Sequence, residues 1–215
     1  MWSILICSTL LVFTAAVPPI VPNVYRNQEC VDGVNNVIDV GNVDNSAALS
    51  IQINDAVVQT YDIDGKPSCY YGRASVQLPG RLKFVKGTLT VSKALDLKTS
   101  GEIRLTLKKD SFFVGTVCQD GISQKGMVPS EDCHRKIYPE FGDKLVEMMS
   151  SPGTYDLEKI EKEARGSNVI KLPPTHGTMS LIVQGDWKAE VALVSNNVKV
   201  ADIKAPSNTE WLYIK

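Results

Sequence analysis

Two stretches of the chain alternate polar and apolar residues without interruption. They are Glu102–Lys108 (EIRLTLK) and Asp186–Leu193 (DWKAEVAL). Because successive side chains of an extended strand point to opposite faces, this period of two predicts strands with one face on a core and the other in water. Such half-buried strands are typical of antiparallel sheets, so the pattern indicates a mainly β fold.

Shorter segments carry the same signal. Strands are expected at Ser50–Ile53, Val57–Ile63, Ala74–Leu78, Leu82–Val91, Met179–Val183 and Val198–Ile203. Residues that favour turns lie between them, and Ser195-Asn196-Asn197 is expected to close a hairpin, since Asn tolerates a positive φ. Six or more strands with regular turns predict a sandwich or barrel.

One long segment, 118–171, interrupts this rhythm. It reads as loop and then as helix, with Phe141, Leu145, Met148 and Met149 recurring at helical spacing. Asp156–Ala164 is a charged segment with a weaker apolar stripe. These apolar residues either pack in the core or cover a binding surface, and the pattern leaves both open.

The first sixteen residues, Met1–Ala16, form an apolar run that ends in small residues. This pattern predicts a cleaved signal peptide, and the run is too short to span about 30 Å of hydrocarbon as a helix. Without Cys7, an even number of cysteines remains: Cys30, Cys69, Cys118 and Cys133. In an oxidising compartment they are expected to form two disulfides, for which three connectivities exist. The expected location is extracellular or the lysosomal lumen.

Composition disfavours several classes of function. The chain has 23 Lys and Arg against 24 Asp and Glu, a net charge of −1, so no nucleic-acid partner is expected. It has two histidines and no recognisable catalytic or cofactor motif, so we expect no enzyme, no cofactor and no metal. The Asn- and Asp-rich run 35–45 lacks the spacing of a calcium loop and is interpreted as solvated turns. A hydrolase would need His134 or His176 beside a nucleophile.

Several segments, in order, resemble the ML lipid-recognition family and within it the ganglioside-activator branch. They lie between Cys69 and Ala205 and comprise Val85–Val91, Glu102–Lys109, Val117–Asp120, Glu131–Cys133, Gly153–Leu157 and Gln184–Leu193. One departure is Asp202, which stands where the family typically has a cysteine. The extension before Cys69 is also longer than the usual start of the family.

The resemblance implies a fold and a domain plan. The fold would be an all-β, immunoglobulin-like sandwich of two antiparallel sheets with a hydrophobic lipid cavity and a short helical or loop insertion. The plan is a signal peptide (1–16), an N-terminal extension (17–68), the sandwich (69–205) with its insertion (118–171), and a C-terminal tail (206–215). On the same basis the disulfides are expected to be Cys118–Cys133 and Cys30–Cys69.

The resemblance further implies a secreted or lysosomal, non-enzymatic protein that takes a lipid from a membrane and presents it to a hydrolase. The lipid would be a glycosphingolipid, a phospholipid or a sterol, the hydrolase a lysosomal glycosidase, and the membrane contact transient. Expected cavity residues are Ile103, Leu105, Leu107, Trp187, Val191 and Leu193, and an expected rim comprises Phe112, Phe113, Phe141, Met148 and Met149. The alternative is a sandwich that binds a protein or carbohydrate and has no lipid cavity.

The adjacent pair Phe112-Phe113 is the sharpest of these candidates. Neighbouring residues on a strand point to opposite faces, so both rings cannot enter one core. At least one of them is therefore expected to meet solvent, lipid or the insertion.

Overall fold

The computed structural model describes residues 29–164, 168–174, 183–209 and 211–215. Strands contain far more of these residues than helices do, which confirms the mainly β class. The strands are β1 (Val37–Asn42), β2 (Ile51–Asp62), β3 (Cys69–Tyr70), β4 (Arg73–Val76), β5 (Gly80–Val91), β6 (Glu102–Lys109), β7 (Thr116–Gln119), β8 (Ile122–Ser123), β9 (His134–Lys136), β10 (Gly153–Asp156), β11 (Val169–Leu172), β12 (Gly185–Ser195), β13 (Val198–Ala205) and β14 (Leu212–Ile214). The helices are α1 (Leu97–Ser100), the 3₁₀ turn η2 (Ser130–Asp132), α2 (Gly142–Ser150) and α3 (Leu157–Ala164).

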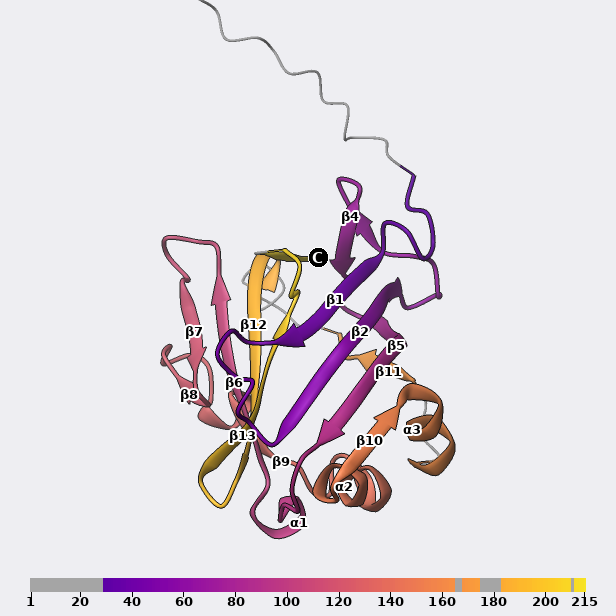
Figure 1. Ribbon diagram of the computed structural model, residues 1–215. Coiled ribbons are helices and arrows are strands. Elements are labelled where there is room, and N and C mark those ends of the chain that lie inside the picture. The colour runs from indigo at the N-terminus through magenta and orange to yellow at the C-terminus, as the bar shows by residue number, and fades with distance from the viewer. Residues whose placement is uncertain (1–28, 165–167, 175–182, 210) are drawn as a thin grey trace, which may run out of the picture.

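The strands form one sheet that curls back on itself (Figure 1). Its order is β10-β5-β2-β1-β13-β12-β14-β4-β3, and β6 lies on the other edge of β12 and carries β7 and β9. We call β1, β2, β5, β10 and β11 the first half, and β6, β7, β8, β9, β12, β13 and β14 the second half. Strand β1 joins them, because its residues Val37–Val40 pair with β2 and Gly41–Asn42 pair with β13.

Six strands, β2, β4, β5, β6, β12 and β13, lie where the alternation predicts strands, whereas the other eight were not expected. The two segments Ser50–Ile53 and Val57–Ile63 are one strand, β2, with a bulge between Asn54 and Val58. Gly87 on β5 permits this bulge, since a Cβ there would lie 3.1 Å from the Cα of Ala56. The predicted β12–β13 hairpin is confirmed, with Asn196 and Asn197 at φ 50° and 61°. Residues 179–182 of the expected strand Met179–Val183 lie outside the described residues.

The interpretation of the run 35–45 as solvated turns is wrong, because its middle part is strand β1. Ile38 is buried opposite Val58, and the Asn42 side chain accepts from Ile53 N (3.0 Å) and donates to Ile53 O (2.8 Å). Asparagine thus replaces a backbone partner where β1 and β2 diverge. Residues 37–42 and 51–62 of the expected N-terminal extension therefore belong to the sheet.

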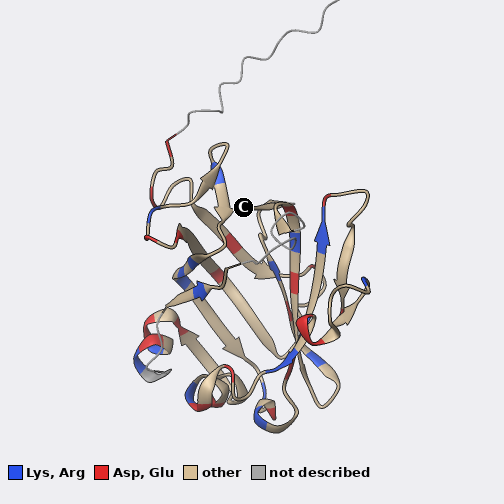
Figure 2. Ribbon diagram, turned by 180° about the vertical axis from the view of Figure 1, so that it is seen from behind, with Lys and Arg blue, Asp and Glu red and all other residues tan. Residues whose placement is uncertain are grey.

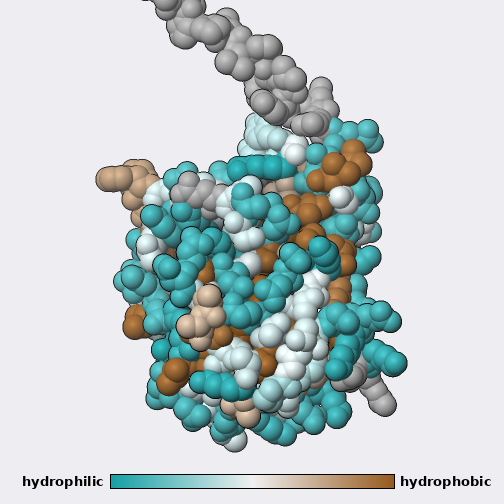
Figure 3. Space-filling view, viewed as in Figure 1, coloured by the Kyte–Doolittle hydropathy of each residue, from teal (hydrophilic) through white to brown (hydrophobic). Residues whose placement is uncertain are grey.

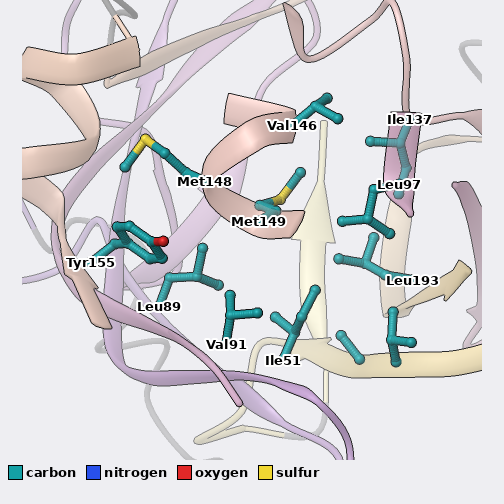
Figure 4. Packing of buried hydrophobic residues seen from close by; sticks show 12 residues of the cluster. Ile51, Leu89, Val91, Leu97, Ile137, Val146, Met148, Met149, Tyr155 and Leu193 are labelled. Carbon is teal, nitrogen blue, oxygen red and sulfur yellow. The ribbon is translucent and has the colours of Figure 1, made fainter. Parts of the chain in front are cut away.

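The main core lies between the two halves and is closed at one end by helices. Ile51, Leu89 and Val91 come from the first half, and Leu193, Val200 and Ala201 from the second (Figure 4). Helix α2 adds Val146, Met148 and Met149 to the same cluster, and it confirms the helix predicted from the spacing of Phe141, Leu145, Met148 and Met149. Among the described residues, no helix is both long and apolar enough to cross a bilayer.

Both expected disulfides form, Cys30–Cys69 and Cys118–Cys133, with Cα–Cα distances of 5.6 and 5.5 Å. Cys118 and Cys133 are buried in a second apolar cluster with Val117 and Trp187. This bridge therefore fixes the segment that contains β7, β8 and η2 against β6. Two disulfides fit a chain that folds in an oxidising compartment.

Removal of the Cys118–Cys133 bridge should lower the free energy of unfolding by about 3 kcal/mol, the value expected for a closed loop of this length. The test is urea unfolding of the Cys118→Ala/Cys133→Ala variant, followed by circular dichroism. An unchanged urea midpoint would contradict this expectation.

The carboxylate of Glu102 should make stability depend on acid pH. A hydrogen bond from Lys136 Nζ (2.8 Å), assisted by Arg104 (3.3 Å), lowers the pKa of Glu102 below its ordinary value of 4.5. The folded state thus gains stability above pH 4.5 and loses this gain as the pH falls through the lowered pKa. Urea midpoints of Glu102→Gln should therefore fall less steeply with acid than those of the native chain. The exposed Glu158→Gln variant is the control and should keep the native slope.

Candidate functional site

Cross-strand register shows which side chains share the inner face of the curled sheet. Residues directly opposite in antiparallel strands point to the same side. Val191 lies opposite both Leu105 and Ile203, and Ile203 lies opposite Asn42. Two-residue steps along β1 lead from Asn42 to Ile38, which is opposite Val58. Because Val58 is in turn opposite Phe84, one face that is apolar except at Asn42 runs from β6 to β5.

This inner face is unevenly covered along its length. Near α1 and α2 it is closed, and Leu193 is only 6% exposed. Further along β6 and β12, Leu105, Leu107 and Val191 are half-buried. The facing part of the first half behaves similarly, since Leu82 and Phe84 are half-buried and Ile170, opposite Leu82 on β11, is 48% exposed. Apolar side chains of both halves thus keep some contact with solvent away from the helices.

The expected cavity residues fall into two groups. Ile103, Leu105, Leu107 and Val191 are half-buried on the inner face. Leu193 and Trp187 are buried, Leu193 in the main core and Trp187 in the second cluster. The Trp187 Nε1 donates to Val183 O at 2.6 Å, which fixes the indole. Leu193 and Trp187 are thus enclosed, whereas the four half-buried residues line the edges of these clusters, Ile103 and Val191 at the main core and Leu105 and Leu107 at the second cluster.

The five residues expected to form one rim do not lie together. Met148 and Met149 are 6% exposed and pack inside the main core (Figure 4). Phe141 is 40% exposed and precedes α2. Phe112 and Phe113 lie in the loop between β6 and β7, at the opposite end of the molecule from α2 (Figure 1). Helical spacing does not show which side of a helix meets the core, so the sequence alone could not distinguish the buried methionines from the exposed phenylalanines.

The phenylalanine pair is placed by a turn and not by a strand, so the argument from strand faces does not apply. Both rings are outside the core, with Phe112 98% and Phe113 89% exposed. The rings contact each other edge to face, with centroids 5.5 Å apart. In Figure 3, apolar atoms (tan) project from the surface at the upper left, where Figure 1 places this loop.

Basic residues lie where β6 meets this loop (Figure 2). Lys108 is directly opposite Lys188 of β12, and both belong to the outer face of their strands. Lys109 has its ammonium 5.8 Å from the centre of the Trp187 ring. Sequence reasoning missed Lys188 as a neighbour of Lys108, because only the register brings β12 beside β6. It also missed Leu82, Phe84 and Ile170, although Leu82 and Phe84 alternate along β5.

A hydrolase would need His134 or His176 beside a nucleophile, and the structure describes only His134. His134 Nδ1 lies 3.0 Å from Gly121 O, in a surface depression lined by Glu102, Glu131, Arg135, Lys136 and Glu140. His176 lies outside the described residues. In the described part of the chain, no three His, Cys, Asp or Glu side chains are grouped as metal ligands.

Comparison with known proteins gives no family for this chain: no protein-family model matches it, and no curated protein matches it.

The two methionines of α2 should matter for stability rather than for surface binding. Met149→Ala removes a buried side chain from the main core, which should lower the free energy of unfolding by about 2–5 kcal/mol. Phe112→Ser, at a fully exposed position, should change it by less than about 0.5 kcal/mol. Urea unfolding of both variants tests this contrast, and equal losses would contradict the placement of these residues.

Proposed function

We propose that this chain is a non-enzymatic lipid-binding protein, which holds the tail of a membrane lipid against the inner face of its curled sheet. The observation that carries the proposal is the row of half-buried apolar side chains that faces inward from both halves. The two halves would act as the two layers of an immunoglobulin-like sandwich that stays partly open between them. The chain would work in the extracellular space or the lysosomal lumen, which its two disulfides fit.

The arrangement of the inner face supports a tail-shaped ligand. Leu105, Leu107 and Val191 follow one another along β6 and β12, and Leu82 and Phe84 follow one another along β5. An acyl chain that leaves a bilayer loses about 0.8 kcal/mol of burial per CH₂ unless another apolar surface replaces the hydrocarbon. Half-buried apolar side chains in two facing rows provide such a surface.

The closed end of the core supports a defined depth for the ligand. Helices α1 and α2 are held together where Lys98 Nζ lies 2.7 Å from Asp143 Oδ1, and α2 places Met148 and Met149 over the core. A tail would therefore stop at this packed cluster, with the headgroup toward the other end. There it would be accessible to a membrane or to a soluble glycosidase.

The direct test is native mass spectrometry of the purified, disulfide-bonded chain, followed by extraction and identification of any bound lipid. Binding of a fluorescent fatty acid in solution provides the affinity. Co-purified sphingolipid, phospholipid or sterol supports the proposal and identifies the ligand class. An empty chain that also fails to bind the fatty acid would contradict it and favour a module for a protein or carbohydrate.

A matched pair of substitutions tests the inner face itself. Ile170→Asp puts a charge on the inner face, whereas Val198→Asp puts the same charge on the β12–β13 hairpin; the two positions are 48% and 60% exposed. Ile170→Asp should weaken fatty-acid binding about tenfold, because an apolar contact is replaced by a charge that resists burial. Val198→Asp should leave binding unchanged, and equal affinities of the two variants would contradict the proposed site. Val191→Trp, which places a larger side chain opposite Leu105, should also weaken binding.

A further inference from the structure

The most exposed large apolar side chains of the described residues are Phe112 and Phe113. Their exposed fractions are 98% and 89%, and the next is Met127 at 70%. A pair of phenylalanines in water is costly, because each aromatic side chain has a large apolar surface. Nothing in the core of the fold requires them, since neither ring belongs to either buried cluster.

The loop that displays the two rings is well held. Gly115 N donates to Ser111 O (2.9 Å), Lys109 N donates to Gly115 O (2.9 Å), and Asp110 N donates to Asp186 O of β12 (2.8 Å). Gly115 has φ 57°, a conformation that favours glycine. Beneath the turn, Val114 packs against the second apolar cluster. The two rings are thus exposed on a turn that backbone hydrogen bonds and the packing of Val114 hold in place.

Positive charge surrounds the base of this turn. Lys108 and Lys109 precede it directly, and Lys188 lies beside Lys108 on the neighbouring strand. The acidic residues at this base are Asp110 and Asp186, and Asp186 is ion-paired with Arg73 (2.6 Å), so the three lysines leave the base of the loop with a positive balance. A flat, anionic surface in contact with the two rings would therefore be attracted by this positive charge.

We infer that the β6–β7 loop is a membrane anchor that inserts Phe112 and Phe113 into the interface of an anionic bilayer while Lys108, Lys109 and Lys188 contact lipid headgroups. A bilayer fits better than a protein pocket. A stable protein interface buries about 800 Å² per partner with complementary shape, whereas a projecting pair of rings needs only a soft apolar layer. Basic residues beside apolar ones strengthen adsorption to anionic lipid.

The anchor gives the proposed lipid-binding function an orientation. The loop lies at the opposite end from α2, which closes the core (Figure 1). The end of the inner face that is half-buried would therefore point toward the bilayer, and the closed end toward water. This inference rests on the proposed function for its purpose, but membrane binding is measured independently of lipid uptake.

The experiment is co-flotation of the purified, disulfide-bonded chain with phosphatidylcholine vesicles, with and without phosphatidylserine, at low and high salt. The native chain should bind the phosphatidylserine vesicles and lose affinity in high salt, because exposed charges are then screened. Phe112→Ser/Phe113→Ser should bind about tenfold or more weakly. Lys108→Gln should bind about fivefold more weakly.

Two control variants are matched to these changes. Ile122→Ser/Met127→Ser removes two exposed apolar side chains from the neighbouring β7–η2 segment, and Lys144→Gln removes an exposed charge from α2. Both should bind vesicles as the native chain does. A Phe112→Trp variant should also show quenching of its fluorescence by brominated lipid, which reports insertion of this position directly.

The outcomes separate the anchor from the proposed function. Loss of vesicle binding in the phenylalanine variant, with fatty-acid binding in solution retained, supports the anchor. A native chain that does not bind vesicles, or controls that lose as much affinity as the loop variants, would overturn it. If vesicle binding follows the prediction but no lipid is taken up, the anchor stands and the proposed lipid-binding function fails.

Discussion

The pairing of β1 with two different neighbours holds the described fold together. This strand of six residues uses Val37–Val40 to continue the first half and Gly41–Asn42 to continue the second. Asn42 makes the transition possible, since its amide replaces the ladder partner of Ile53 at the point where the strands separate. Because β1 turns the sheet at this point, the inner faces of the two halves face each other. The main core and the proposed lipid site are consequences of that geometry.

The two ends of the inner face differ because helices cover only one of them. Helix α2 brings Val146, Met148 and Met149 against residues from both halves, so this end is packed as an ordinary core. Beside β6 and β5 the same alternating pattern of apolar residues continues, but the side chains are only half-buried. On β6 and β12 these side chains still contact the edges of the two buried clusters, so their apolar surface is shared between core and solvent.

Local features were predictable from the sequence, whereas features that depend on distant partners were not. Alternation located β6 and β12 because each strand carries its own period of two, and Asn196-Asn197 located the hairpin because its φ values are local. The run 35–45 resembles turns because it is rich in asparagine, and the role of Asn42 as a substitute for the backbone partner of Ile53 depends on the folded arrangement of β1 and β2. The position of Met148 likewise depends on which side of α2 meets the core, and spacing alone does not determine this.

The fold buries one pair of large apolar residues and exposes another. Met148 and Met149 have adaptable side chains, and the fold buries them. Phe112 and Phe113 carry larger apolar surfaces, yet the fold exposes them on a turn held by backbone hydrogen bonds. A sheet hairpin needs no aromatic residue at such a turn, and a polar pair would cost nothing in packing there. The exposed pair is therefore the basis of the inferred membrane anchor, and the lysines at its base favour an anionic bilayer as its partner.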